Sequence, residues 1–389
     1  MSVLDLLWIL LPVAAAAGWF AAKRSDSRSS QAFWDYTSHF HQGLNVILSE
    51  QDVKTSELFD NLSDASSDTA DTHIALGNHY RRKGEIERAI RLHESVIAQP
   101  DLDQDIKANA RFELALDYDS AGLLDRSESV LNELIATGYR KADAYQNLMQ
   151  LHEREKDWAQ AIKVALNCHD DTGVDTSSRI AHYFCERAEI ASKDAQVDEA
   201  RSLLDEALEH WPHCARASIL LADLARESGD FERAAQLYDF VESIRPELMP
   251  EIIDKRFEVF KQADNAGQLK DFIARIHAQR NAYSVIRSTR AVIAEQHSDK
   301  LADRFFKDQI LKRPSLKGLR DWAHDQLVLS KPDEREKVQV ICNLLDQVME
   351  DKPAYRCCSC GFQGNVMHWR CPSCGTWDSV STIIGVEGE

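Results

Sequence analysis

Glycine and proline are scarce in this chain, with 15 and 9 among its 389 residues. Such small numbers exclude a β-sandwich, which needs a turn after every short strand, and the glycine-rich loops of nucleotide-binding folds. Hydrophobic residues make up 44% of the chain and charged residues 28%, which excludes a disordered body and a polytopic membrane protein. The composition therefore predicts an all-α fold.

Positive charge is also in short supply. Lysine and arginine number 46 against 64 aspartate and glutamate residues, so the formal net charge is −18. Binding to a nucleic-acid backbone depends on basic surface, and we therefore expect no nucleic-acid partner.

The sequence lacks the signatures of common catalytic sites. It contains no G-x-S-x-G elbow, no G-x-x-x-x-G-K-[ST] loop and no H-E-x-x-H helix. His152 beside Glu153, and His182 near Cys185, stand in helical sequence, where such pairs are ordinary packing or surface residues. We assign no catalytic residue and predict that the protein is not an enzyme.

Residues 3–22 form one long apolar run, VLDLLWILLPVAAAAGWFAA, in which Asp5 is the single charge. At about 1.5 Å per residue, a helix of this length spans the roughly 30 Å core of a bilayer. A cleaved signal peptide is the alternative, but signal peptides carry lysine or arginine before the apolar run. Here the basic residues follow it, beginning at Lys23. This order predicts a transmembrane anchor with its N-terminus outside and the rest of the chain in the cytoplasm.

Residues 36–350 repeat at intervals near 34 residues, which is typical of a tetratricopeptide solenoid of helix–turn–helix units. The clearest unit has Gly77 and Tyr80 on a first helix, Gly84 at the turn and Ala89 on a second helix. Alanines in phase with Ala89 recur in later units: Ala161, Ala200, Ala234 and Ala302. We expect about nine repeats, some of them degenerate.

In such a solenoid the first helices line a concave surface that receives a peptide or a partner's helix. The candidate contact residues share inward positions on first helices. They are Asn78, Arg81, Arg82, Gln150, Asp223 and Arg226. Most inward positions are ordinary solvated ones, but Arg81 and Arg82 can hold a carboxylate by paired hydrogen bonds.

The C-terminal segment YRCCSCGFQGNVMHWRCPSCGTW carries two C-x-x-C pairs separated by ten residues. Four thiolates at this spacing suit one tetrahedral metal ion. The predicted ligands are Cys357, Cys360, Cys371 and Cys374. Gly361 and Gly375 follow the two pairs where the chain must turn tightly, and we expect Cys358 to point away from the ion. Zinc and iron both accept four sulfurs, so the choice of iron or zinc stays open.

The other four cysteines are scattered through helical sequence: Cys168, Cys185, Cys214 and Cys342. A cytoplasmic location disfavours disulfides, and free cysteine is among the most buried residue types. We therefore expect these four to be small packing residues.

Together these features divide the chain into four parts. They are a transmembrane anchor at residues 1–22, a polar juxtamembrane linker at 23–35, the tetratricopeptide solenoid at 36–350 and a four-cysteine metal-binding domain at 351–389.

An apolar segment reading LLPVAAAAGWF, a train of tetratricopeptide units, and a tail reading YRC-x-x-CGF then HWRCPSCGTW together resemble the lipopolysaccharide assembly protein B family. The resemblance covers essentially the whole chain, although the extra Cys358 departs from the expected pattern. It implies a rubredoxin-type metal domain at the C-terminus and a single-pass protein of the inner membrane.

The resemblance further implies an adaptor that regulates lipopolysaccharide synthesis. Its implied partners are an FtsH-type membrane AAA protease, the lipid A pathway deacetylase that this protease degrades, and other lipopolysaccharide synthesis or transport proteins. Two other functions stay open. A rubredoxin-like electron carrier would hold iron with a reversible redox signal, and a purely structural scaffold would leave the levels of the synthesis enzymes unchanged when it is lost.

Overall fold

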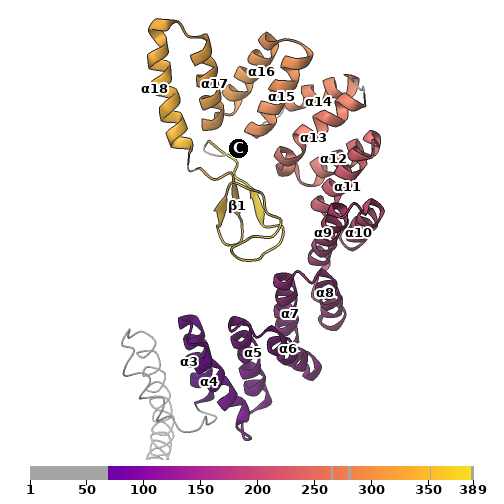
Figure 1. The fold of residues 1–389 in the computed structure, drawn as a ribbon, viewed down its shortest axis with the longest axis vertical. Helices are drawn as coiled ribbons and strands as arrows, with labels where there is room; N and C mark the ends of the chain where they lie inside the picture. The colour runs from indigo at the N-terminus through magenta and orange to yellow at the C-terminus, as the bar shows by residue number, and fades with distance from the viewer. Residues whose placement is uncertain (1–68, 264–265, 279–281, 351, 387–389) are drawn as a thin grey trace, which may run out of the picture. The chain divides into compact units, whose positions relative to one another are not determined.

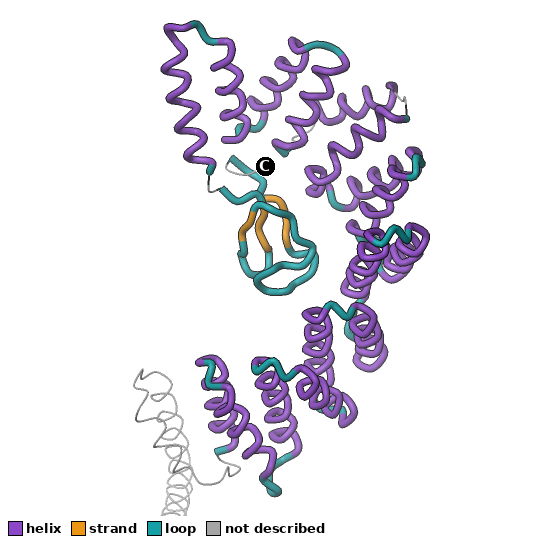
Figure 2. Tube along the Cα trace, in the orientation of Figure 1, coloured by secondary structure: helices purple, strands orange, loops and turns teal. Residues whose placement is uncertain are grey.

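The computed structural model describes residues 69–263, 266–278, 282–350 and 352–386 (Figure 1). The predicted anchor at 1–22, the predicted linker at 23–35 and the expected first repeat up to residue 68 lie outside these described residues. Helices make up most of what is described, and three short strands follow near the C-terminus (Figure 2). Within the described ranges, no helix is both long enough and apolar enough to traverse a bilayer.

The chain divides into two compact units, Met1–Arg154 and Glu155–Glu389. In the first unit α3 packs on α4, α5 packs on α6, and α3 also contacts α5. Its described helices are α3 (Ala70–Lys83), α4 (Ile86–Ala98), α5 (Gln104–Ser120), α6 (Leu124–Thr137) and α7 (Lys141–Glu155). Gly84 ends α3, and Ala89 is fully buried on α4, as the repeat pattern predicts.

The second unit is also built from helix pairs: α9 packs on α10, α11 on α12, α15 on α16 and α17 on α18. The helices are α8 (Trp158–Thr172), α9 (Ser177–Lys193), α10 (Val197–His210), α11 (Ala215–Glu227), α12 (Phe231–Ile244), α13 (Met249–Gln262), α14 (Ala266–Ala278), α15 (Tyr283–Gln296), α16 (Asp299–Lys312), α17 (Leu316–Leu329) and α18 (Pro332–Met349), with a 3₁₀ turn, η1 (Pro246–Leu248), before α13. The first helices of successive pairs touch one another, α9 with α11, α11 with α13 and α13 with α15. They form one side of an arc that curves around the strands of the same unit (Figure 1).

Small residues allow the two helices of a repeat to cross closely. The in-phase alanines are at most 1% exposed: Ala161, Ala200, Ala234 and Ala302. Ala234 and Ala302 belong to a continuous apolar core that runs from Ala215 in α11 to Phe306 in α16. The degenerate repeat of α13 and α14 joins this core through aromatic contacts, with the Phe257 and Phe272 rings 5.6 Å apart. The structure therefore confirms the solenoid of paired helices that the 34-residue period predicts.

A small domain follows α18. Its sheet has the order β2-β1-β3 and is antiparallel throughout. The strands are β1 (Tyr355–Cys357), β2 (Gln363–Gly364) and β3 (Val380–Thr382). Tyr355 pairs with Gly364 on one side and with Thr382 on the other, so β1 is the central strand. The two strand connections carry the cysteine pairs.

Candidate metal centre

The four predicted ligand sulfurs lie together. The Sγ atoms of Cys357, Cys360, Cys371 and Cys374 all lie within 4.8 Å of one another. The Cys357 and Cys374 sulfurs are 3.8 Å apart, and those of Cys360 and Cys371 are 3.7 Å apart. Four sulfurs held about 2.3 Å from a central ion at tetrahedral angles are about 3.8 Å from each other. The donor set and its spacing therefore fit one tetrahedral metal ion.

The two cysteine pairs form turns of the same design. Gly361 has φ +78° and donates its N–H to the Cys357 carbonyl at 3.0 Å, and Gly375 has φ +71° and donates to the Cys371 carbonyl at 2.9 Å. A side chain at either position would be strained in this left-handed conformation. Glycine thus lets each turn bring two thiols to the same point.

Hydrogen bonds and burial set the thiol pKa values differently across the site. Burial raises the pKa of Cys357, but the hydrogen bond with the Ser379 hydroxyl and those with the Cys360 and Ser359 backbone outweigh burial and bring the pKa to about 6. At Cys371 burial prevails and raises the pKa to about 11. A cation bound by the four sulfurs would favour the thiolate at each of them.

Cys358 does not join this group. It follows Cys357 at the end of β1, and successive side chains of a strand point to opposite faces. Its side chain is exposed, with Sγ 3.5 Å from the Ser381 hydroxyl oxygen. The structure therefore forms the first turn from Cys357 and Cys360.

The metal domain packs against the helices of its own unit through tryptophans. Trp377 lies just beyond the second cysteine pair, and its ring stacks on His182 of α9 at 5.0 Å with an interplanar angle of 18°. The Trp377 ring also contacts Trp158 at 6.2 Å and Tyr183 at 5.9 Å. Met367 and Trp369 pack against the core of the helices. The metal domain is thus seated on the helices rather than joined to them only through the chain.

Polar contacts reinforce this seat. The Arg245 guanidinium donates to Asp378 at 2.6 Å, and the Tyr355 hydroxyl donates to Glu251 of α13 at 2.5 Å. Near the end of the described chain, the Leu316 N–H of α17 donates to the Val386 carbonyl at 2.7 Å. These contacts join the metal domain to helices that precede it by up to 133 residues.

His182 is a packing residue of this seat. It is fully buried, and burial lowers the pKa of its imidazole to about 3, so the ring that stacks on Trp377 is neutral. The nearby Cys185 thiol contacts the Cys214 thiol, and burial raises its pKa well above the usual value. A neutral thiol in the core is a poor nucleophile. The four scattered cysteines are all buried, as predicted: Cys168, Cys185, Cys214 and Cys342.

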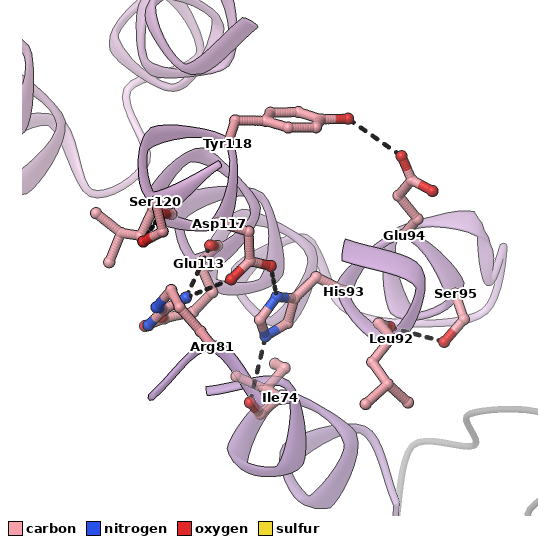
Figure 3. A network of polar contacts seen from close by, with 11 residues as sticks. Ile74, Arg81, Leu92, His93, Glu94, Ser95, Glu113, Asp117, Tyr118 and Ser120 are labelled. Atoms are coloured by element: carbon pink, nitrogen blue, oxygen red, sulfur yellow. Dashed lines mark hydrogen bonds and ion pairs between the residues drawn. The ribbon is translucent and has the colours of Figure 1, made fainter. Parts of the chain in front are cut away.

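Arg81 is held in a buried polar network (Figure 3). Its guanidinium donates to Asp117 at 2.8 Å and to Glu113 at 2.7 Å, both on α5. Asp117 also lies 2.5 Å from Nδ1 of the fully buried His93, and a Cβ at Gly77 would lie 2.4 Å from Nε2 of that ring. The glycine of this repeat therefore makes room for His93, and Arg81 joins α3 to α5.

Two other candidate groove residues form similar links between successive first helices. Asp223 of α11 accepts hydrogen bonds from Tyr238 and from Lys255, each at 2.6 Å. Arg226, one turn further along α11, pairs with Glu258 of α13 at 3.0 Å. These side chains hold neighbouring repeats in register.

The remaining candidates have a different setting. Arg82 of α3 and Gln150 of α7 are exposed. Asn78 is half-buried, and its Oδ1 atom has no hydrogen-bond partner among the described residues. Of the candidates on the first unit, Arg82 and Gln150 therefore have exposed side chains, whereas the unpartnered Asn78 oxygen is buried.

Family models match both the repeats and the metal domain. Family models for the tetratricopeptide repeat match residues 72–106 and 185–246, and a model for a rubredoxin metal-binding domain matches residues 355–381. Among solved structures, YrrB, titled a TPR protein with an unusual peptide-binding site, is 17% identical over 51% of this chain and 95% of its own, with a TM-score of 0.30.

Among curated proteins, lipopolysaccharide assembly protein B of Escherichia coli K12 is 28% identical over 392 residues, covering 99% of this chain and all of that protein. The Haemophilus influenzae protein of the same name is 27% identical over 399 residues with the same coverage. The repeats and the metal domain occur in the order that the sequence predicted. The chain therefore resembles lipopolysaccharide assembly protein B over its full length, with tetratricopeptide repeats followed by a rubredoxin-type metal-binding domain.

Proposed function

We propose that this protein is a membrane-anchored adaptor that regulates lipopolysaccharide synthesis. In this role it presents the lipid A pathway deacetylase to an FtsH-type membrane protease, and it gathers other lipopolysaccharide synthesis or transport proteins. The observation that carries the proposal is the full-length similarity to proteins named for lipopolysaccharide assembly. Helix pairs that expose first helices on one side supply the binding surface that such an adaptor needs.

The proposal assigns a task to each part of the chain. Residues 1–22 anchor the protein in the inner membrane as a single pass, and residues 23–35 link this anchor to the cytoplasmic body. Residues 36–350 bind partners through the inner side of the repeats, and residues 351–389 hold one iron or zinc ion. The proposed partner contacts are Asn78, Arg82 and Gln150 directly, and Arg81, Asp223 and Arg226 through the register of the helices that carry them.

The proposed metal ligands are Cys357, Cys360, Cys371 and Cys374. A bound ion would supply a cross-link between the two cysteine turns, which are otherwise joined by a small sheet and a small apolar cluster. Because the same domain carries Trp377, which packs on α9, the cross-link also preserves the surface that seats the domain on the helices.

The deciding experiment is depletion of this protein in its native cells, followed by measurement of deacetylase half-life. We expect the half-life to lengthen several-fold, and re-expression of the full chain to restore it. An unchanged half-life with intact lipopolysaccharide assembly would contradict the adaptor role. If the half-life is unchanged while assembly fails, the structural scaffold is the correct function.

The electron-carrier alternative has its own test. It requires iron in the purified protein and a reversible redox signal from the four-sulfur site. Full activity of a zinc-loaded protein in the depletion assay would exclude that alternative.

A further inference from the structure

A cavity of about 400 Å³ opens between α13 and α15. Its floor is apolar and consists of Phe257, Ala291 and Val292. The spacing of residues along α13 shows on which side of the repeats the cavity lies. Asp254 and Glu258 lie one and two turns beyond Glu251, on the same face of the helix, and Glu251 is the residue that receives the Tyr355 hydroxyl of the metal domain. The cavity is therefore on the inner side of the repeats, next to the seat of the metal domain.

Charged side chains of both signs surround the apolar floor. Glu258 is already paired with Arg226 of α11, and Lys261 is paired with Glu295 across the cavity. Asp254 and Arg287 also line it.

The charges of these last two side chains are not paired in this way, although Arg287 interacts electrostatically with Tyr283, one turn earlier on α15. Asp254 of α13 and Arg287 of α15 are both exposed. Within the described ranges neither takes part in a hydrogen bond or an ion pair. Each lies in the first half of its helix, and both line the cavity, one from each wall. They therefore lie at a similar height along the two helices. The cavity thus offers one carboxylate and one guanidinium on opposite sides of an apolar floor.

We propose that this cavity binds a short peptide segment of a partner protein. The segment places an apolar side chain on the floor, a lysine or arginine against Asp254, and an aspartate or glutamate against Arg287. The axes of packed helices are about 8–10 Å apart, and an extended chain advances about 3.3 Å per residue. The basic and acidic residues therefore stand two or three positions apart, with the apolar residue between them. The inference rests on the proposed adaptor function, for which it supplies the chemistry of the partner.

The charge pattern favours a peptide over a small apolar ligand. Three apolar residues make only a shallow floor, whereas a peptide can satisfy both unpaired charges and bury one side chain at the same time. An apolar ligand would cover the floor but form no hydrogen bond or ion pair with Asp254 or Arg287.

The test uses the full-length protein in detergent and four fluorescent nonapeptides with identical glycine–serine flanks. Their central residues are Lys-Leu-Glu, Glu-Leu-Lys, Lys-Leu-Lys and Glu-Leu-Glu, and binding is measured by anisotropy at low salt. We expect the better of the two mixed peptides to bind about fivefold to tenfold more tightly than either like-charged peptide. Asp254→Lys should reverse this preference towards Glu-Leu-Glu, and Arg287→Glu should reverse it towards Lys-Leu-Lys. Asp198→Lys makes the same charge change on the exposed surface of α10 and should leave the preference unaltered.

Equal binding of the four peptides, or equal effects of Asp254→Lys and Asp198→Lys, would overturn the proposal. Failure of this proposal and failure of the adaptor role give different experimental results. If deacetylase turnover still depends on the protein while the peptides do not discriminate, this cavity is not the contact. If the charge reversals exchange the peptide preferences while turnover is independent of the protein, the cavity binds peptides and the proposed function is wrong.

Discussion

The exact position of each cysteine determines whether its sulfur lies at the metal centre. Cys357 and Cys371 are each 1% exposed, so replacement of either sulfur alters the inner part of the site rather than its rim. Cys358 is adjacent in sequence to Cys357 but lies just past the end of β1, with its exposed sulfur near Ser381. One residue of separation thus distinguishes a proposed ligand from a surface thiol.

We expect Cys371→Ser to remove most of the bound metal. Three thiolates hold a tetrahedral ion poorly, and the second cysteine turn loses its inner ligand, so metal affinity should fall at least about tenfold. Cys358→Ser is the matched control and should retain about one ion per chain. Elemental analysis of desalted protein gives the metal-to-chain ratio. Equal loss in the two variants would show that the first turn uses Cys358.

At the scale of elements, the seat of the metal domain depends on one loop that places Trp377 against α8 and α9. The Trp377 ring contacts Trp158, His182 and Tyr183. Polar links to α13 and α17 lie elsewhere on the domain, so Trp377 supplies the apolar part of the contact together with Met367 and Trp369.

Trp377→Ala should therefore release the metal domain from the helices without emptying its metal site. Loss of this half-buried ring should cost on the order of 2–4 kcal/mol. Amide hydrogen exchange in residues 355–382 should become faster, while the metal-to-chain ratio stays near one. Trp322→Ala, at a site that is 41% exposed, is the control and should change stability by no more than about 0.5 kcal/mol. Unchanged exchange in the Trp377 variant would show that the other contacts are sufficient for docking.

The helices could be predicted from the sequence because each repeat carries its own local signals. Ala200 and Ala234 are in phase in the sequence and are both fully buried in the structure. The partners of Arg81 could not be predicted from spacing, because they lie 32 and 36 residues away in the next repeat. For the same reason, the contact between the metal domain and the helices could not be predicted from the sequence. The sequence feature that indicates this contact is the presence of Trp369 and Trp377 in a domain too small to bury them.

The cavity between α13 and α15 was also missed, for a different physical reason. Asp254 and Arg287 are ordinary charged residues in the sequence, and Asp254 lies in the degenerate repeat of α13 and α14, whereas Arg287 lies on α15 in the next repeat. Only the folded structure shows that all their charged neighbours at the cavity are paired, whereas these two are not.

At the scale of the whole molecule, the proposed anchor acts by raising the local concentration of the protein beside the membrane protease. A repeat surface of modest affinity gains from attachment to the membrane that also holds the protease, because tethering makes the second encounter effectively intramolecular. Such tethering raises avidity by roughly 10²–10⁴. The anchor need not contribute any chemistry of its own for this effect.

Removal of residues 1–22 should therefore leave a folded, metal-loaded protein that no longer supports rapid deacetylase turnover in cells. Replacement of the same residues by an unrelated N-out transmembrane helix should restore most of the turnover, because tethering alone supplies the lost avidity. Quantitative blotting of the deacetylase after translation arrest measures both effects. If the replacement fails although the protein is correctly inserted, a specific contact within the membrane is required, and Asp5, Trp8 and Pro12 are the residues to exchange first. Normal turnover in cells that contain only the truncated protein would show that tethering plays no part.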